Sequence, residues 1–220
     1  MLACRRATEI SHDYSTTNTN QGDGVSGSGL MSAKGVSVVA FSGALYAVFF
    51  FLSYLIAVPS FTILYLPIVL LGVFPVWFGL PGLLGSMIGA VVGGLFVENL
   101  GFLAWIELVT TLIIYVLNWV LMPSKAAEDG SRKKWGLLFG VYAFTLFVGT
   151  SYILWQFTVV GLIPADVALV LLLPTFALNY VIEVVVCPIL IRTMSARLRD
   201  WGVYAGNFWE WRKHPKAEPS

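Results

Sequence analysis

Six long apolar runs, separated by short polar or proline-containing breaks, occupy most of the chain after Lys34. A helix needs roughly 20 apolar residues to cross a bilayer, and backbone polar groups in lipid must be satisfied by regular hydrogen bonding. The runs therefore predict an all-α integral membrane protein with six transmembrane helices. The predicted spans are residues 36–58, 61–78, 80–97, 100–121, 135–160 and 166–191.

The composition also favours a membrane protein. Hydrophobic residues make up 58% of the chain and charged residues 11%, which leaves too little polar surface to cover a water-soluble globule. One transmembrane domain is predicted over residues 34–199. Residues 1–33 are rich in Ser, Thr, Asn and Gly and predict a disordered polar cytoplasmic tail. Residues 200–220 form an aromatic and basic tail, which suits either a segment at the lipid headgroups or a loosely ordered end.

The basic residues predict the orientation of the spans, because Lys and Arg gather in cytoplasmic loops near the ends of spans. With six spans, the basic positions before the first span, between the fourth and fifth, and after the sixth fall on one side. The other three connections contain no Lys or Arg. We therefore expect a multi-pass protein of the cell membrane with both termini in the cytoplasm. The residues behind this prediction are Lys34, Lys125, Arg132, Lys133, Lys134, Arg192, Arg197 and Arg199.

Glycines recur at three- and four-residue spacing in the predicted span 80–97. They are Gly82, Gly85, Gly89 and Gly93. Residues at this spacing share one helical face, and a face without side chains lets another backbone approach closely. Packing between helices is the main interpretation of this pattern.

The first predicted span carries a second set of small residues. Ala40 and Ala44 lie one turn apart on the same helical face. This pair serves either packing within the bundle or the docking of another membrane subunit. Periodicity alone does not choose between these roles.

Acidic side chains lie inside or at the edges of the apolar runs, where ionisable groups mark candidate functional sites. Glu98 and Asn99 stand at the outer corner between the third and fourth spans, and Trp105 and Glu107 follow within two turns. No basic residue on that side of the membrane is available to pair with Glu107. Because an unpaired buried carboxylate is costly, a bound cation, a polar neighbour or a proton has to compensate.

Further polar and aromatic residues are predicted at a similar depth. Tyr152, Trp155 and Gln156 lie near the outer end of the fifth span, and Asn179 in the sixth span is placed to floor an outer pocket. Aromatic rings and carboxylates at one depth suit a flat, cationic or hydrogen-bonding ligand, such as a thiamine-like or pyrimidine-like compound. The candidate substrate-binding residues are Glu98, Asn99, Trp105, Glu107, Tyr152, Trp155, Gln156 and Asn179.

Several of these acids and aromatic residues also suit simpler roles. Trp105 and Trp155 stand at interfacial depth, where Trp anchors helices at the headgroups. Glu98 suits a solvated position in the outer loop, and Asp166 suits a cap of the sixth helix. Glu183 lies too deep for an outer pocket and is placed to face the cytoplasmic Lys and Arg cluster.

Three segments of the chain resemble the substrate-binding S components of energy-coupling factor (ECF) vitamin transporters, over nearly all of residues 36–199. The first span looks like their first helix, whose AxxxA pair is matched by Ala40 and Ala44. The segment YLPIVLLGVFPVWFGLPGLLGSMIGAVVGG is similar to their second and third helices, in which a proline and a glycine-rich hairpin follow a short span. The segment LLLPTFALNYVIEVVVCPILIRTMSARL looks like their sixth helix, with a proline, a mid-helix Asn and a terminal basic cluster.

The resemblance implies a six-helix, S-component-like bundle and a non-enzymatic subunit that binds a vitamin or related micronutrient from outside the cell. The implied partners are a transmembrane coupling subunit and two cytoplasmic ATPases, which would carry out any ATP hydrolysis. Ala40 and Ala44 would form the contact with the coupling subunit. No metal, cofactor or nucleic acid is expected, and the long N-terminal tail departs from the family pattern.

Other classes of function were weighed against the residues. The only histidines, His12 and His214, lie in the tails, so Ser/His catalysis and HExxH zinc sites have no residues inside the membrane. A proton- or cation-linked carrier or channel is an alternative, because Glu107 and Glu183 lie in opposite halves of the membrane. A membrane scaffold or sensor that binds a partner through the glycine face is a third class.

Overall fold

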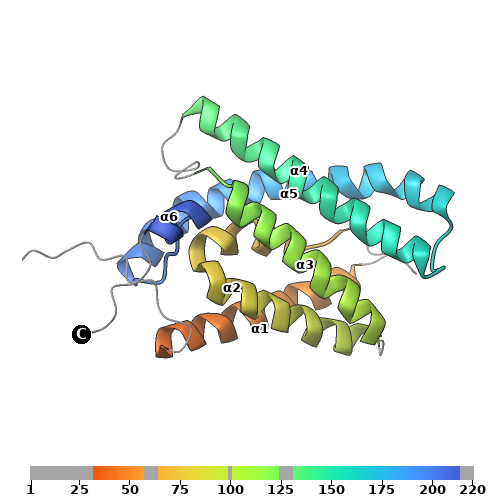
Figure 1. The fold of residues 1–220 in the computed structure, drawn as a ribbon, viewed down its shortest axis with the longest axis horizontal. Coiled ribbons are helices and arrows are strands. Elements are labelled where there is room, and N and C mark those ends of the chain that lie inside the picture. The colour runs from red at the N-terminus through yellow and green to blue at the C-terminus, as the bar shows by residue number, and fades with distance from the viewer. Residues whose placement is uncertain (1–31, 57–63, 99–100, 124–130, 214–220) are drawn as a thin grey trace, which may run out of the picture.

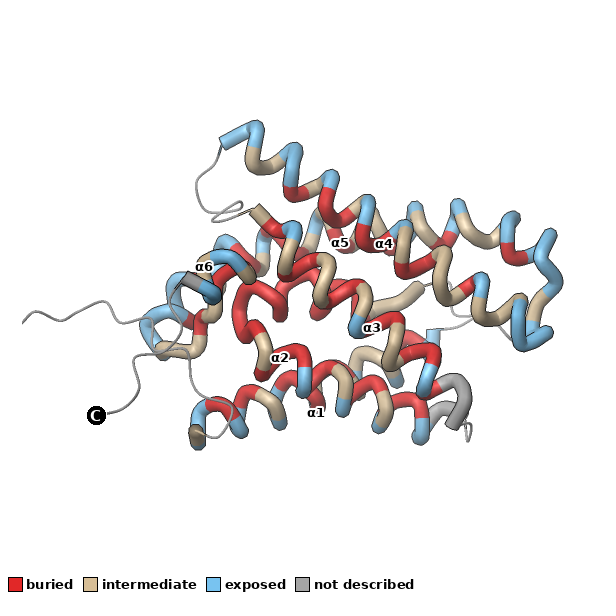
Figure 2. The backbone as a smooth tube through the Cα atoms, in the orientation of Figure 1, coloured by how far each residue is buried: buried red, intermediate tan, exposed pale blue. Residues whose placement is uncertain are grey.

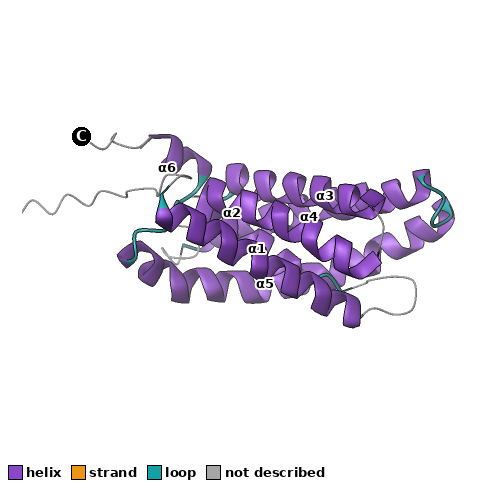
Figure 3. Cartoon of the chain, turned by 90° about the horizontal axis from the view of Figure 1, so that it is seen from below, coloured by secondary structure: helices purple, strands orange, loops and turns teal. Residues whose placement is uncertain are grey.

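A computed structural model describes residues 32–56, 64–98, 101–123 and 131–213. Its long helices run roughly along one axis of the molecule (Figures 1 and 3). Five of the helices, α1 to α5, are long and apolar enough to cross a membrane. The predicted all-helical class is confirmed, and the five apolar helices indicate a multi-pass membrane protein. The helices are α1 (Ala33–Leu55), α2 (Pro67–Glu98), α3 (Gly101–Leu121), α4 (Arg132–Val159), α5 (Ala165–Asp200) and the short α6 (Phe208–Lys213).

The predicted second and third spans form a single element, α2, with a break inside it. Gly79 has a φ of 53° and a ψ of −129°, a conformation that residues with a side chain rarely adopt. The chain folds back there. The short distance across the bend shows this: a Cβ atom at Gly82 would lie 3.4 Å from the carbonyl oxygen of Phe74. In a straight helix, residues eight apart are separated by about 12 Å along the axis. The predicted boundary at residues 78–80 coincides with this bend (Figure 1), although the bend leaves five apolar helices where six were expected.

The part of α2 before the bend, residues 67–78, is buried on every side (Figure 2). Two of its backbone carbonyls bond to other parts of the bundle. Pro75 has no N–H group and so leaves the Leu71 carbonyl without its helical donor; Nδ2 of Asn118 in α3 donates to that carbonyl at 3.1 Å. The bend at Gly79 leaves the carbonyl of Trp77 without a helical donor as well, and this carbonyl accepts from the backbone N–H of Ala205 at 2.9 Å.

The glycine face of α2 after the bend packs against α1. A Cβ atom at Gly85 would lie 3.0 Å from the backbone nitrogen of Gly43. A Cβ atom at Gly89 would lie 2.8 Å from Cβ of Tyr46 and would overlap the Gly43 carbonyl oxygen, and one at Gly93 would press against Phe50. The predicted close approach of two helix backbones is therefore confirmed for Gly85 and Gly89, whereas Gly93 faces a side chain.

Ala40 and Ala44 are both exposed on α1. The side of α1 that faces the bundle carries Gly43 and Tyr46 instead. Among the described residues, the alanine pair does not pack inside the bundle, which was one of its two predicted roles. The pair instead forms part of the outer surface of α1.

Basic side chains gather at one end of the molecule. Helix α1 begins and α5 ends at this end (Figure 1), where Nζ of Lys34 donates to the carbonyl of Trp201 at 3.4 Å. In the described part of the chain, every Lys and Arg lies at the start of α1, at the start of α4, near the end of α5 or in α6. We call this the basic end. Its described residues are Lys34, Arg132, Lys133, Lys134, Arg192, Arg197, Arg199, Arg212 and Lys213.

The chain after α5 is an ordered part of the basic end. Nδ2 of Asn207 donates to the carbonyl of Met122 at 3.1 Å, and Nε1 of Trp209 donates to the carbonyl of Val120 at 3.0 Å. These carbonyls lie at the C-terminal end of α3, where backbone acceptors lack helical partners. Residues 201–213 are therefore ordered, and their position at the lipid headgroups stays a prediction.

Candidate functional site

Glu107 is the centre of a buried hydrogen-bonded cluster. Its side chain is 5% exposed, and its Oε1 atom accepts hydrogen bonds from the hydroxyl groups of Tyr46, at 3.0 Å, and of Tyr65. The Tyr46 hydroxyl also lies 2.6 Å from Oγ1 of Thr111. Tyr46, Tyr65, Glu107 and Thr111 are called the Glu107 cluster below.

Helix packing accounts for the position of Tyr46 in this cluster. The small residues Gly43 and Gly89 let α1 and α2 approach closely, and Tyr46 is fully buried where they meet. On α3, Glu107 and Thr111 are four residues apart and therefore share a helical face. The hydroxyl of Tyr46 bonds to both of them, which joins α1 to α3.

Tyr65 comes from the segment just before α2 and joins the cluster to α5. Its backbone N–H donates to Oδ1 of Asn179 at 2.8 Å, while its hydroxyl donates to Glu107. The next backbone N–H, of Leu66, donates to Oγ of Ser53 in α1 at 2.8 Å. Two predicted site residues, Glu107 and Asn179, are thus brought together through a residue that the sequence analysis did not select.

Among the described residues, hydroxyl donors contact Glu107, while the Lys and Arg residues lie at the basic end. Residues 35–123 include no Lys, Arg or His, and the groups that bond to the carboxylate are tyrosine hydroxyls. Such hydrogen bonds offset part of the cost of burying a carboxylate, but they bring no positive charge. The cluster is therefore suited to hold an ammonium, a protonated ring or another hydrogen-bond donor.

The predicted residues at the outer end of α4 bond to one another. Nε2 of Gln156 donates to the hydroxyl of Tyr152 at 3.0 Å, which confirms that these two residues share a helical face. The ring of Trp155, 58% exposed, lies 6.1 Å from that of Tyr152 between centroids. Among the described residues, these polar groups pair with each other rather than with Glu107.

The remaining predicted residues lie at helix ends or on the surface. Trp105 is 66% exposed, which fits a side chain at the lipid interface better than a pocket wall. Glu98 ends α2, but its side chain and the whole of Asn99 lie outside the described residues. Asp166 is not the cap of α5, because Pro164 holds that position and Asp166 lies in the first turn. A carboxylate there is favoured by the helix dipole.

Glu183 forms a second buried acidic site, deeper in the bundle. It is fully buried, and neither of its carboxylate oxygens has a hydrogen-bond partner among the described residues. The expected pairing with the basic cluster is therefore not observed there. Cys187 lies one turn later on α5, and a Cβ atom at Gly72 would lie 3.1 Å from Oε1 of Glu183. The amide of Asn118 lies near Glu183; its Nδ2 donates to the Leu71 carbonyl at 3.1 Å and its Oδ1 accepts from Thr145 at 2.8 Å.

The sequence analysis missed three members of the Glu107 cluster: Tyr46, Tyr65 and Thr111. The four-residue spacing of Glu107 and Thr111 was a usable signal, because it places two polar groups on one face of an apolar helix. For Tyr46, the signal was its position three residues after Gly43 in a face of small residues. Tyr65 carried no such pattern, because its role depends on how the segment before α2 crosses the bundle.

Comparisons of this chain with protein-family models, with curated proteins and with solved structures give no match.

Proposed function

We propose that this chain is the membrane-embedded substrate-binding subunit of an ECF-type transporter, and that its ligand is a vitamin or related micronutrient with a cationic or hydrogen-bond-donating group. The Glu107 cluster carries the proposal. Among the described residues, the Glu107 carboxylate, 5% exposed, bonds to hydroxyl groups and has no charge partner. A cationic ligand group supplies that partner. In the proposed complex the ligand takes the place of the Tyr65 hydroxyl as a hydrogen-bond donor to Oε1 of Glu107.

In this proposal the chain crosses the membrane six times, because α2 folds back at Gly79 and contributes two crossings. The bend at Gly79 and the fully buried residues 67–78 support this arrangement. The basic end then lies in the cytoplasm, as the positive-inside rule expects. The start of α1 and the end of α5 share that side, and Glu107, near the start of α3, lies in the outer half of the plasma membrane.

Energy comes from partners in this proposal. Ala40 and Ala44 dock onto a transmembrane coupling subunit that two cytoplasmic ATPases drive. The support is their position, because both are exposed on the outer surface of α1. Small side chains on an outer helical face let a partner helix approach closely.

The ligand part of the proposal is tested by mass spectrometry of small molecules that stay with the gently purified protein. The wild type should retain a cationic or amino-bearing heteroaromatic compound near one per chain, and Glu107→Gln should retain at least tenfold less, as expected for loss of a charged hydrogen bond of about 1.5–3 kcal/mol. Asp166→Asn removes an exposed carboxylate on the outer side and serves as the control. Equal retention by Glu107→Gln would remove Glu107 from the site, and an empty wild type would count against a binding subunit.

The coupling part is tested by separating uptake from binding. Ala44→Trp should abolish uptake of the identified compound by cells and leave its retention by the purified protein unchanged. Leu137→Trp places the same bulk on an exposed position of α4, 56% exposed, and should leave both properties intact. Normal uptake by Ala44→Trp would exclude the alanine pair as the docking surface. Loss of both properties would assign it to folding or to the pocket.

A second candidate function is a proton- or cation-linked carrier, and the observation that favours it is Glu183. A fully buried carboxyl group whose oxygens have no partner among the described residues is suited to take up and release a proton or a small cation. Liposomes that contain the purified protein would then show a proton or sodium flux that Glu183→Gln abolishes. Absence of flux from wild-type liposomes would exclude this candidate.

A further inference from the structure

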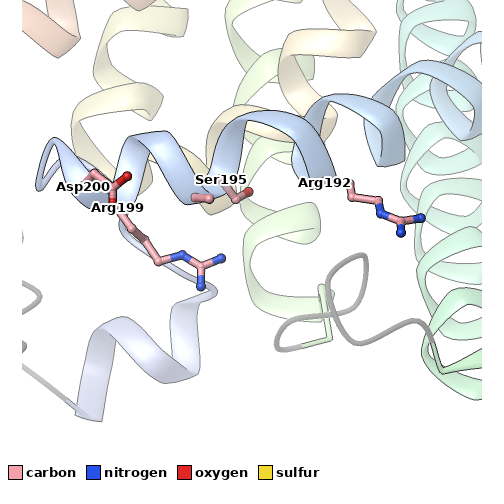
Figure 4. A pocket seen from close by; sticks show the side chains of 5 residues that line it. Arg192, Ser195, Arg199 and Asp200 are labelled. Atoms are coloured by element: carbon pink, nitrogen blue, oxygen red, sulfur yellow. The ribbon is translucent and has the colours of Figure 1, made fainter.

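The last turns of α5 border a surface hollow of about 430 Å³. Four of its lining residues follow each other at spacings of three, one and three along α5, so they share one helical face. Figure 4 shows the side chains of Arg192 and Arg199 extending from the same side of the helix, with Ser195 between them. The lining residues are Arg192, Ser195, Ala196, Arg199 and Asp200.

The net charge of the residues that line the hollow is positive, because they include two guanidinium groups and one carboxylate. The guanidinium group of Arg199 lies over the ring of Tyr204, 4.7 Å from its centroid, and this contact restricts the positions that the side chain adopts. The buried floor is fixed to α2, since Nε1 of Trp77 donates to Oγ of Ser195 at 3.2 Å. Guanidinium groups offer pairs of N–H donors that match the oxygens of a phosphate.

An exposed apolar stripe runs along α5 and ends at this hollow. Val181, Val185 and Ile189 are 57%, 54% and 57% exposed at four-residue spacing, and Arg192 follows Ile189 by three residues, which keeps it on the same side of the helix. Trp201, 62% exposed, follows the end of α5, and Trp is the residue typical of the lipid interface. The hollow therefore lies where a membrane-spanning surface meets the headgroups.

We propose that this hollow binds the phosphate-bearing headgroup of an anionic phospholipid, whose acyl chains lie along the exposed stripe of α5. The stripe favours a lipid over a soluble phosphate compound, because acyl chains would contact the adjacent apolar surface and a soluble anion would not. The basic end supplies a positive field that attracts anionic headgroups. Bound lipid then connects the end of α5 to the surrounding bilayer, independently of what the Glu107 cluster binds.

The test is native mass spectrometry of the full-length protein in neutral detergent, with phosphatidylglycerol or phosphatidylcholine added. The wild type should retain phosphatidylglycerol in preference to phosphatidylcholine. Arg192→Gln combined with Arg199→Gln should weaken phosphatidylglycerol binding roughly thirtyfold, from the usual contribution of two basic residues near an anionic membrane surface. Arg197→Gln is the matched control, because Arg197 is exposed on the same turn of α5 and does not line the hollow.

Arg192→Gln alone keeps the contact between Arg199 and Tyr204, so it tests the site even if the double variant folds poorly. It should lower phosphatidylglycerol binding by a smaller factor, and Arg192→Lys should restore most of it. Equal binding of the two lipids by the wild type would overturn the proposal, as would equal effects of Arg192→Gln and Arg197→Gln. Displacement of the lipid by millimolar inorganic phosphate would identify a general anion site instead.

Discussion

At the residue scale, glycines at the contact between α1 and α2 determine how the Glu107 cluster is assembled. Gly89 faces Gly43 and Tyr46 so closely that no Cβ atom fits there without displacement. This close contact allows Tyr46 to be fully buried in the bundle, where its hydroxyl bonds to Glu107 and Thr111. The glycine face is therefore part of the support of the candidate site as well as a packing surface.

Gly89→Ala should lower the stability of the protein, whereas Gly136→Ala should not. The added methyl group at residue 89 would overlap the Gly43 backbone and press on Tyr46, and overpacking of this kind costs about 1–3 kcal/mol. At Gly136 in α4 nothing lies within 4 Å of the added atom, so alanine should be neutral or stabilise by about 0.5–1 kcal/mol. Thermal unfolding in detergent micelles measures both. Equal unfolding midpoints for the two variants would contradict the observed packing.

At the scale of elements, α2 determines the arrangement of the bundle. Its first part is surrounded by other helices, and the carbonyls freed by Pro75 and by the bend at Gly79 accept donors from α3 and from the chain after α5. An apolar helix that is buried on all sides needs no amphipathic face, which fits the uniformly apolar sequence of this part. The bend at Gly79 then returns the chain along α1.

Gly79→Ala should destabilise the protein more than Gly161→Ala does. Both glycines have positive φ, 53° and 77°, which costs an alanine about 1–2 kcal/mol. At Gly79 the new atom would also lie 2.9 Å from Cβ of Ala205 and 3.2 Å from the ring of Trp119, whereas nothing lies within 4 Å at Gly161. The extra overpacking adds about 1–3 kcal/mol. Comparison of unfolding midpoints checks this, and a Gly161→Ala variant as unstable as Gly79→Ala would show that packing at the bend is unimportant.

At the scale of the whole molecule, the sequence predicted elements better than their contacts. Apolar runs and glycine spacing predicted the helical class, the boundary at Gly79 and the packing face of α2, because these depend on local pattern. Glu107 stood out because an acid in an apolar run is rare. Its partner Tyr65 did not, because tyrosine is common at membrane depth and the contact requires the fold. The sequence also did not show that Glu183 lacks a basic partner among the described residues, because its distance from the basic end depends on the fold.

The segregation of charge also predicts which ends of the helices face the same compartment. Ser131→Cys lies just before α4 at the basic end, and Leu162→Cys lies in the loop between α4 and α5, where Leu162 is 54% exposed. In a Cys4→Ser background, a membrane-impermeant maleimide should label residue 162 from outside intact cells and residue 131 only in inverted vesicles, because basic loops stay in the cytoplasm. Cys187 is fully buried and should stay unlabelled in both preparations. Labelling of both introduced cysteines from the same side would mean that α4 does not cross the membrane. The reverse pattern would place Glu107 on the cytoplasmic side and contradict uptake from outside.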